Sequence, residues 1–215
     1  MNIQRRKKLS HKDLAIYKQT LKLTDQQKEI IVGTLLGDSS ISVRKGVPHY
    51  SIKFEQGEMH RGYVEHLYEV FEPYCGSSPS ERFIDKNKTR KAVWFRTYSH
   101  IDIKFYFDLF YDYVPNASNA KKVVPLNIEK FLTPRALAYW YMDDGHKTDY
   151  ACELNTQGFD VAGINRLCTA LTNKFGLRTS QDSGQKLRIW AESRDKFFDL
   201  IRPNIHPDFE YKIKI

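Results

Sequence analysis

The chain has 215 residues, of which 41% are hydrophobic and 13% aromatic, and its formal net charge at pH 7 is +8. This length and composition predict a folded protein with a sizeable core, and no apolar run is long enough to cross a membrane. The excess of basic residues favours a polyanionic partner, with nucleic acid ahead of an anionic membrane surface, although a basic protein without such a partner has the same charge.

A basic arm is predicted for residues 1–22, and it includes a short helix. The first half of the chain follows with a second helix. Thr24 and Gln27 have the spacing of a capping box, in which each side chain binds the other residue's backbone N–H, so this helix starts here. Its run from Ile30 to Leu36 is almost entirely apolar, which predicts a buried helix that stops just before Asp38.

The first half spans residues 23–113 and continues with alternating hairpins and helices. Period-two alternation predicts strands, whereas apolar residues spaced three or four apart predict helices. The expected elements are a hairpin over 40–56, a helix over 59–74, a hairpin over 80–99 that turns near Asn87, and a helix that starts at Ile101. A linker over 114–132 separates this half from the next.

The second half, residues 133–215, repeats the plan. Thr133 can cap a helix with Pro134 at its first position. The expected elements after it are a strand pair over 146–157, a helix ended by Gly176, a hairpin that turns at Ser183 and Gly184, and a helix that stops at Pro203. The shared order indicates an internal duplication of about 100 residues. It predicts an α+β fold with antiparallel sheets rather than a parallel α/β fold.

The three cysteines, Cys75, Cys152 and Cys168, lack the close pairing that zinc sites use. An odd number of thiols also argues against a disulfide framework. We therefore expect core or semi-buried free thiols in an intracellular, reducing compartment, with a mitochondrion or a chloroplast among the options.

Each half opens with a buried helix that ends in an aspartate, Asp38 in the first half and Asp144 in the second. Acids at a helix C-terminus are disfavoured by a few tenths to ~1 kcal/mol, because that end carries partial negative charge. If the halves pair about a pseudo-twofold axis through these helices, both carboxylates meet there and repel unless a cation lies between them. Such hard oxygen ligands suit Mg²⁺, and metal-bound water can hydrolyse a phosphodiester. One Asp–Gly after a helix is an ordinary turn, but repetition at equivalent positions favours a site.

The residues around both aspartates resemble a known family. The segment LAYWYMDDG is similar to the LAGLIDADG motif, with matches at Leu137, Ala138, Asp144 and Gly145. The segment IVGTLLGDS is a weaker copy, with matches at Gly33 and Asp38. Tyr139 replaces the motif's first glycine in the second copy, and Ser39 replaces its last glycine in the first. From Leu23 to Lys212, the chain resembles the monomeric, double-motif LAGLIDADG homing endonucleases of group I introns.

The resemblance implies two pseudo-twofold-related αββαββα halves whose sheets form a DNA-binding saddle, with the motif helices at the interface. It implies a monomer that hydrolyses both strands of a long asymmetric target across the minor groove and leaves short 3′ overhangs. The implied metal ligands are the carboxylates of Asp38 and Asp144 and the backbone carbonyls of Gly37 and Asp143. The expected ion is Mg²⁺, with Mn²⁺ as a substitute and Ca²⁺ supporting binding without cleavage.

Two lysines match basic positions of the family's active sites. They are Lys122 in the linker and Lys212 near the end of the chain. Each would stabilise charge that builds on the phosphate or help to order a water. Without the family match, a solvated surface lysine is an equally good interpretation of both.

Two-stranded ribbons fit the major groove of DNA, and each half offers two of them. Arginine can read guanine and glutamine adenine, whereas lysine mostly meets phosphate. Any one such residue is more often solvated surface, so the indication is their clustering. The predicted DNA contacts are Arg44, Lys45, His49 and Lys53 in the first hairpin; Arg82, Lys86, Lys88, Arg90, Lys91 and Arg96 in the second; and His146, Lys147, Arg178, Gln181, Gln185, Lys186 and Arg188 in the second half. Trp94 and Trp190 are expected in the core.

Two alternatives share the expected fold. One is a maturase that assists splicing and binds intron RNA, and the other is a DNA-binding protein that does not cut. Such proteins tend to lose the acids, so the presence of Asp38 and Asp144 favours the enzyme, although some maturases keep them. A membrane-surface protein is disfavoured, because no amphipathic basic helix beyond the arm is long enough. Double-stranded DNA is therefore the expected partner, with intron RNA second.

Overall fold

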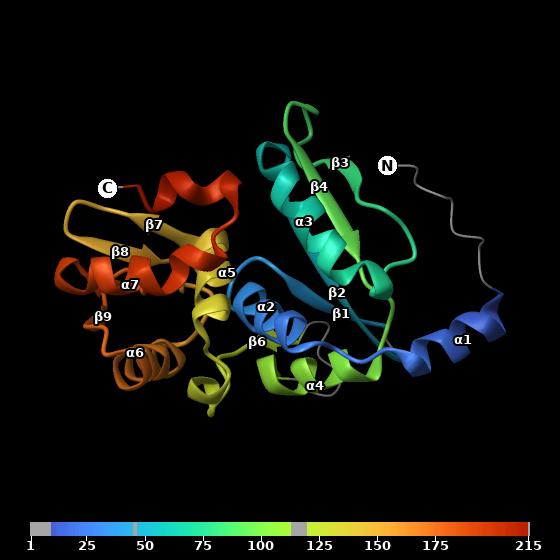
Figure 1. Cartoon of the computed structure of the whole chain (residues 1–215), viewed down its shortest axis with the longest axis horizontal. Helices are drawn as coiled ribbons and strands as arrows, with labels where there is room; N and C mark the ends of the chain where they lie inside the picture. The colour runs from blue at the N-terminus through green and yellow to red at the C-terminus, as the bar shows by residue number, and fades with distance from the viewer. Residues whose placement is uncertain (1–9, 45–46, 113–119, 215) are drawn as a thin grey trace.

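The computed structural model describes residues 10–44, 47–112 and 120–214. Figure 1 shows two halves side by side, with the helices α2 (Asp25–Leu36) and α5 (Pro134–Asp144) between them. Three predicted features lie outside the described residues: the first nine residues of the arm, the turn of the first hairpin, and the boundary between the first half and the linker.

Both halves contain a four-stranded antiparallel sheet with the same topology. The strand orders are β1-β2-β4-β3 and β7-β8-β10-β9. The first half consists of α2, β1 (Ser40–Arg44), β2 (Val47–Gly57), α3 (Arg61–Phe71), β3 (Ser80–Phe83), β4 (Lys91–Arg96) and α4 (Ile101–Phe110). The second half consists of α5, β7 (Gly145–Lys147), β8 (Ala151–Leu154), α6 (Val161–Phe175), β9 (Thr179–Gln181), β10 (Leu187–Trp190) and α7 (Arg194–Ile201). The predicted α+β class with antiparallel sheets is confirmed.

The local signals that set the helix ends act as expected. Thr24 and Gln27 form the capping box at the start of α2, with both reciprocal hydrogen bonds present. Thr133 caps α5 by accepting a hydrogen bond from the Ala136 N–H. Gly176 ends α6 in the left-handed conformation with φ of 59°, which glycine adopts without strain.

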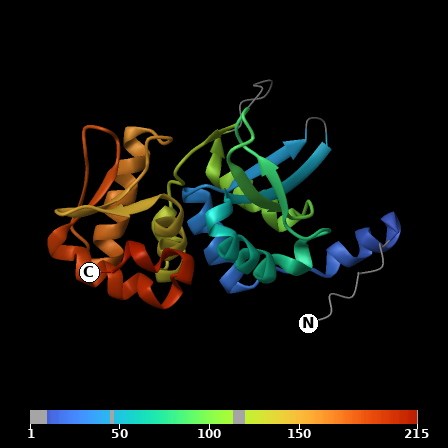
Figure 2. The ribbon, with the colours of Figure 1, turned by 90° about the horizontal axis from the view of Figure 1, so that it is seen from above.

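One hydrophobic core extends through both halves. Every residue of α5 from Ala136 to Met142 is buried, as is nearly all of α2 from Ile30 onward. An ion pair between Arg135 and Glu29 joins the two helices near their N-termini. Seen from above in Figure 2, the two sheets lie on either side of this helix pair. The interface between the halves is therefore part of the core itself.

The predicted linker has structure that the sequence did not indicate. The helix expected from Ile101 ends at Phe110, because the next two residues form strand β5 (Tyr111–Asp112). This strand pairs in antiparallel fashion with β6 (Lys121–Lys122). A 3₁₀ turn, η3 (Ile128–Lys130), then leads to α5. The β5–β6 pair places Lys122 beside α2.

The two tryptophans expected in the core are instead half-buried on the opposite face of each sheet. Side chains alternate along a strand, and the core takes Val93 and Phe95 from β4 and Leu187 and Ile189 from β10. Trp94 and Trp190 therefore point to the other face. We call this face of each sheet the open face. Lys53 Nζ lies 5.7 Å from the Trp94 ring centre, and Arg188 Cζ lies 5.6 Å from that of Trp190.

The C-terminal segment of the second half crosses to the first half. Its final 3₁₀ helix, η6 (Pro207–Lys212), packs against the start of α3. The Asp208 carboxylate accepts a hydrogen bond of 3.0 Å from the Tyr63 N–H, one of the unpaired donors at that helix N-terminus. The Phe209 ring stacks on His60 at 4.3 Å between centres. The segment thus closes an end of α3 that lacks a side-chain cap of its own.

Helix α1 (His11–Thr20) extends from the first half and has no buried residue. Tyr17 donates a hydrogen bond to the Pro73 carbonyl, and the His100 ring contacts the Lys18 carbonyl. His100 also caps α4, because its ring accepts a hydrogen bond from the Asp102 N–H. The cysteines are free and buried or partly buried, as predicted. None of the described helices is long and apolar enough to cross a membrane.

Candidate active site and DNA-binding face

The close approach of α2 and α5 brings the two aspartates together. A Cβ at Gly33 would lie 2.2 Å from the Ala136 carbonyl oxygen and 2.9 Å from the Tyr139 Cβ, so only glycine fits there. Tyr139 stands where the motif has glycine, but its hydroxyl lies 2.7 Å from His66 Nε2 on α3. Its ring therefore points away from the helix crossing, and the departure from the motif does not separate the helices.

The aspartates belong to a network that crosses the interface. Gln56, near the end of β2, donates to Asp38 Oδ2 at 2.7 Å and to Asp143 Oδ1 at 3.2 Å. Asp143 also accepts from the Asp38 N–H and from the Tyr63 hydroxyl. A Cβ at Gly37 would lie 2.5 Å from the Asp143 Cβ, so Gly37 leaves room for this carboxylate. The Asp143 carboxylate, which belongs to the second half, is thus held by three donors of the first half.

Mutual repulsion and burial raise the pKa of two of the three carboxyls. Burial raises the pKa of Asp144 to about 7, and the charge of Asp38 adds to the rise, while Lys122 and Lys212 oppose it. Burial and the same Asp38 charge hold the pKa of Asp143 well above its ordinary value. Asp38 itself is exposed. Full ionisation of the three carboxyls is therefore costly unless a cation lies among them.

Each predicted active-site lysine lies at the C-terminus of one central helix. Lys122 Nζ donates to the carbonyls of Gly37 and Ser39 at 2.9 and 2.8 Å, beyond α2. Lys212 Nζ donates to the carbonyls of Met142 and Tyr141, at 2.6 and 3.4 Å, in α5. Burial lowers the pKa of both lysines, although the nearby aspartates counteract it. The pair repeats the pseudo-twofold arrangement of the acids.

The donor set fits a hard divalent cation that keeps part of its coordination shell for water and substrate. Within the described residues, no group of three or more His, Cys, Asp or Glu side chains is arranged to hold a metal. Asp38 and Asp144 nevertheless supply carboxylate oxygens beside a clustered negative charge, which is the chemistry that Mg²⁺ prefers when it binds few protein ligands. The implied Gly37 carbonyl is engaged by Lys122 here, so a metal there would compete with that lysine.

Two cavities flank the acids, one in each half. A cavity of about 290 Å³ is lined by Asp38, Gln56 and open-face residues of the first sheet. A cavity of about 430 Å³ is lined by Asp143, Asp144 and Lys212 in the second half. Each cavity is therefore bordered both by an acid of the centre and by residues of a sheet.

Most of the predicted DNA contacts gather on the open faces or on the hairpin tips. Lys53 on β2 and Arg96 on β4 are direct cross-strand neighbours. In the second sheet, His146 and Arg188 are the cross-strand neighbours of Glu153 on its two sides. His49 precedes Lys53 on β2. The exposed residues at the tips or flanks are Arg82, Lys86, Lys88, Arg90, Arg178 and Gln185, and Lys186 is half-buried at the start of β10. Lys45 and the side chain of Arg44 lie outside the described part of the chain.

Three of the predicted contacts lie on the opposite face from the others. Cross-strand partners share a face, so Lys147, opposite Cys152, and Gln181, opposite Leu187, lie on the core side of their strands. Lys91 has the same parity as the buried Val93 and pairs with Glu81 and Glu58. Membership of a hairpin does not reveal the face of the sheet, which the two-residue period of a strand sets, so these three residues lie apart from the open face.

Several residues of the site went unnoticed in the sequence. Gln56 bridges Asp38 and Asp143, Tyr63 donates to Asp143, and Glu153 lies among the basic residues of the second sheet. Gln56 lies within the alternating strand β2 and has no spacing that singles it out. Tyr63 matches the apolar stripe of α3 and reads as core, which it also is.

Two halves share one topology, pack through helices that end in aspartates, and carry basic antiparallel sheets; this is the fold of a double-motif endonuclease. The family comparison agrees. The chain belongs to the LAGLIDADG DNA endonuclease family, whose sequence model matches residues 28–197.

The relatives extend over nearly the whole chain. DNA endonuclease I-ChuI of Chlamydomonas applanata is 32% identical over 211 residues, which cover 90% of this chain and 96% of that protein. The cytochrome b mRNA maturase bI2 of Saccharomyces cerevisiae is 28% identical over 195 residues, 86% of this chain but 46% of the maturase. Among solved structures, the homing endonuclease I-WcaI bound to its DNA recognition sequence superposes with a TM-score of 0.82 and 28% identity, over 96% of this chain and 95% of that one.

Proposed function

We propose that the protein is a site-specific endonuclease that hydrolyses one phosphodiester bond in each strand of a long, asymmetric DNA duplex and leaves short 3′ overhangs. The observation that carries this proposal is the arrangement of Asp38 and Asp144 at the ends of the packed helices α2 and α5, each helix end with its own lysine. One chain holds both halves, so a monomer suffices. The similarity to I-ChuI and I-WcaI supports the same activity.

The proposed chemistry assigns a role to each residue of the centre. Asp38 and Asp144, with the carbonyls of Gly37 and Asp143, would hold divalent metal, for which we propose Mg²⁺. Such an ion acts as a Lewis acid and lowers the pKa of a bound water when it occupies the site. Lys122 and Lys212 lie close to the acids and stabilise negative charge that develops on the phosphate. Gln56 fixes the orientation of Asp38.

The open faces of the two sheets are the proposed DNA-binding surface. Two-stranded ribbons enter the major groove on either side of the centre, which leaves the minor groove over the aspartates. Arginines and Gln185 supply base contacts, and the lysines contact mainly phosphates. The long target follows from two sheets that read separate stretches of duplex, and its asymmetry follows from their different side chains.

A role in RNA splicing is the second candidate. It is favoured by the similarity to the yeast cytochrome b mRNA maturase. The relatives also include a probable intron-encoded endonuclease of Wickerhamomyces canadensis and a chloroplastic protein of rice. We therefore propose that the protein is intron-encoded and acts in a mitochondrion or chloroplast.

A splicing assay on the protein's own intron would separate a role in RNA splicing from DNA cleavage.

The decisive test is cleavage of a duplex that contains the intronless insertion site of its own intron. We expect cutting of both strands with Mg²⁺ or Mn²⁺, and binding without cutting in Ca²⁺, because Ca²⁺ fills an oxygen site but tolerates irregular geometry. Efficient cutting in EDTA would contradict the proposed metal. Intact duplex under all conditions, with splicing activity present, would favour the second candidate.

A further inference from the structure

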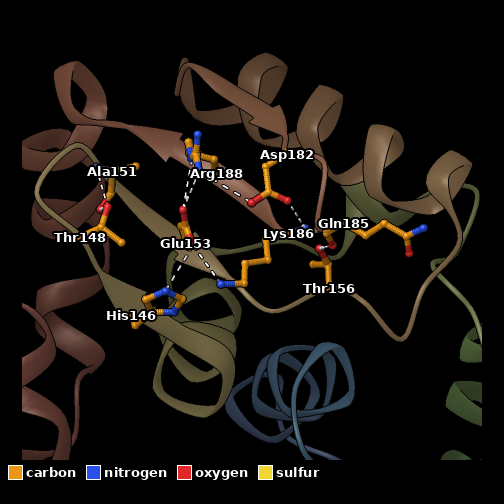
Figure 3. Close-up of polar contacts among 9 residues, drawn as sticks. All are labelled: His146, Thr148, Ala151, Glu153, Thr156, Asp182, Gln185, Lys186 and Arg188. Atoms are coloured by element: carbon orange, nitrogen blue, oxygen red, sulfur yellow. Dashed lines mark hydrogen bonds and ion pairs between the residues drawn. The ribbon is translucent and has the colours of Figure 1, made fainter.

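Glu153 is an acid in the middle of the proposed DNA-binding face. Its side chain is only 9% exposed, and Figure 3 shows three basic side chains converging on it. Arg188 donates from Nε and Nη2 to Oε1, at 3.2 and 2.8 Å. Lys186 Nζ and His146 Nε2 each lie 3.3 Å from Oε2. A polyanion-binding surface has no need of a buried acid for affinity, so the position calls for another explanation.

The carboxylate is ionised at neutral pH. Burial by itself would raise the pKa of Glu153, but the hydrogen bonds from Arg188 and Lys186 outweigh burial and bring the pKa below its ordinary value. Charge-assisted hydrogen bonds of this kind are stronger and more directional than neutral ones. Glu153 is therefore a fixed negative point around which the neighbouring cations are oriented.

Arg188 is constrained on three sides. Glu153 accepts hydrogen bonds from the Nε and Nη2 edge of its guanidinium. Asp182 Oδ2 lies 3.7 Å from Nη2, and the Trp190 ring faces Cζ at 5.6 Å from the ring centre. The side chain still keeps 31% of its surface exposed. A guanidinium has five N–H donors in a rigid plane, so the edge that carries Nη1 remains available in a fixed orientation. That geometry matches the two acceptors, O6 and N7, of guanine.

The first half has an open-face acid as well, but it holds a different arginine: Glu55 accepts from Nε and Nη2 of Arg82 and pairs with Lys53. Arg96 faces Lys53 across the strands, whereas Arg188 faces Glu153. Among the described residues, no acidic side chain forms an ion pair with Arg96, and Lys53 pairs with Glu55 instead. The two halves thus carry an arginine at equivalent positions, one exposed and one held in place.

We propose that Glu153 is a positioning residue for base recognition, which holds Arg188 so that its free edge binds a guanine in the major groove of the second half-site. The proposal rests on the DNA-binding function proposed above. Lys186 balances the charge of Glu153 toward the phosphates, and the His146 ring completes the cluster. The discrimination of one or two neighbouring base pairs therefore depends on an acid that itself does not contact DNA.

The test uses the full-length protein in Ca²⁺ and the duplex that the wild type selects from a random-sequence library. If the wild type enriches no sequence, the proposed function itself fails. Otherwise, each base pair of the selected duplex is replaced in turn, and affinities are measured for the wild type, Glu153→Gln, Arg188→Gln and the double variant. We expect Glu153→Gln to lose about tenfold of the discrimination at one or two adjacent base pairs in one half of the duplex.

Three further readouts separate positioning from a structural role. Arg188→Gln should lose discrimination at the same base pairs, and the double variant should lose no more, since the two residues act as a unit. Affinity of Glu153→Gln for unrelated duplex should stay or rise, because one negative charge is gone. Glu55→Gln, which removes an acid from the open face of the first sheet, should leave those base pairs unaffected. Unchanged discrimination in Glu153→Gln, or a uniform loss at all base pairs with a lower melting temperature, would overturn the proposal.

Discussion

Replacing Gly33 with alanine tests the helix packing that brings the acids together. The new Cβ would lie 2.2 Å from the Ala136 carbonyl oxygen, whereas ordinary contact begins at 3.4 Å. Both obstructing atoms belong to the backbone or to a Cβ, so α2 and α5 must move apart by roughly 1 Å. Overpacking of this kind costs about 1–3 kcal/mol, and the better helix propensity of alanine offsets about 1 kcal/mol of that.

A contact of 2.2 Å is far inside van der Waals distance, so we expect a cost in the upper part of this range, about 2–3 kcal/mol. The net loss is then about 1–2 kcal/mol of unfolding free energy, or about 2–8 °C in melting temperature for a protein of this size. Cleavage should suffer more than stability, because a shift of about 1 Å at the reacting groups can lower the rate roughly 100-fold. Thermal unfolding and single-turnover cleavage measure the two effects. Gly158→Ala is the control, since a Cβ there meets no atom within 4 Å. A Gly33→Ala variant that melts at or above the wild type would refute the close packing.

Three other predictions concern charge. Asp144→Asn and Asp38→Asn should each abolish nearly all cutting while affinity stays similar or rises, because asparagine is nearly isosteric and removes a negative charge near the phosphates; equal loss of binding and cutting in a gel assay would mean a structural role. In metal-free protein, the raised pKa of Asp144 contributes stability that is present in full below pH about 4 and is lost as the pH rises through about 7. Melting curves of the wild type and Asp144→Asn in EDTA should therefore diverge over that range, with the variant less sensitive to pH. Binding should weaken steeply with salt, with a slope of log K against log salt of about −0.9 per phosphate contact; a flat plot would contradict a DNA role.

The sequence predicted those parts of the fold that depend on local signals. The capping box at Thr24, the cap at Thr133 and the stop at Gly176 determine helix ends through nearby backbone groups, so they can be recognised without the tertiary structure. The duplicated order of helices and hairpins then placed Asp38 and Asp144 at equivalent positions. The central helices and their acids could therefore be anticipated.

The remaining features depend on contacts between distant segments. Strand β6 exists only because Lys121 and Lys122 pair with Tyr111 and Asp112 of β5, and two-residue strands leave no periodicity to detect. Gln56 contacts Asp143 only because the first sheet packs beside the end of α5 in the folded protein. Trp94 and Trp190 occupy equivalent places in the fourth strand of each sheet, which does not reveal the face of the sheet that they join; strand parity decides that face.

The contact between η6 and α3 has a consequence for recombining halves of such proteins. The Asp208 carboxylate of the last segment accepts a hydrogen bond from the Tyr63 N–H of the first half. The neighbouring Gly62 makes room for it, because a Cβ there would lie only 3.1 Å from the Asp208 carboxylate oxygens. A chimera that joins this first half to a foreign second half would uncap α3 unless the incoming chain brings an equivalent segment. The natural unit of exchange is therefore not the half defined by sequence repetition, but that half together with the seven residues of the opposite terminus, 206–212, that close its helix.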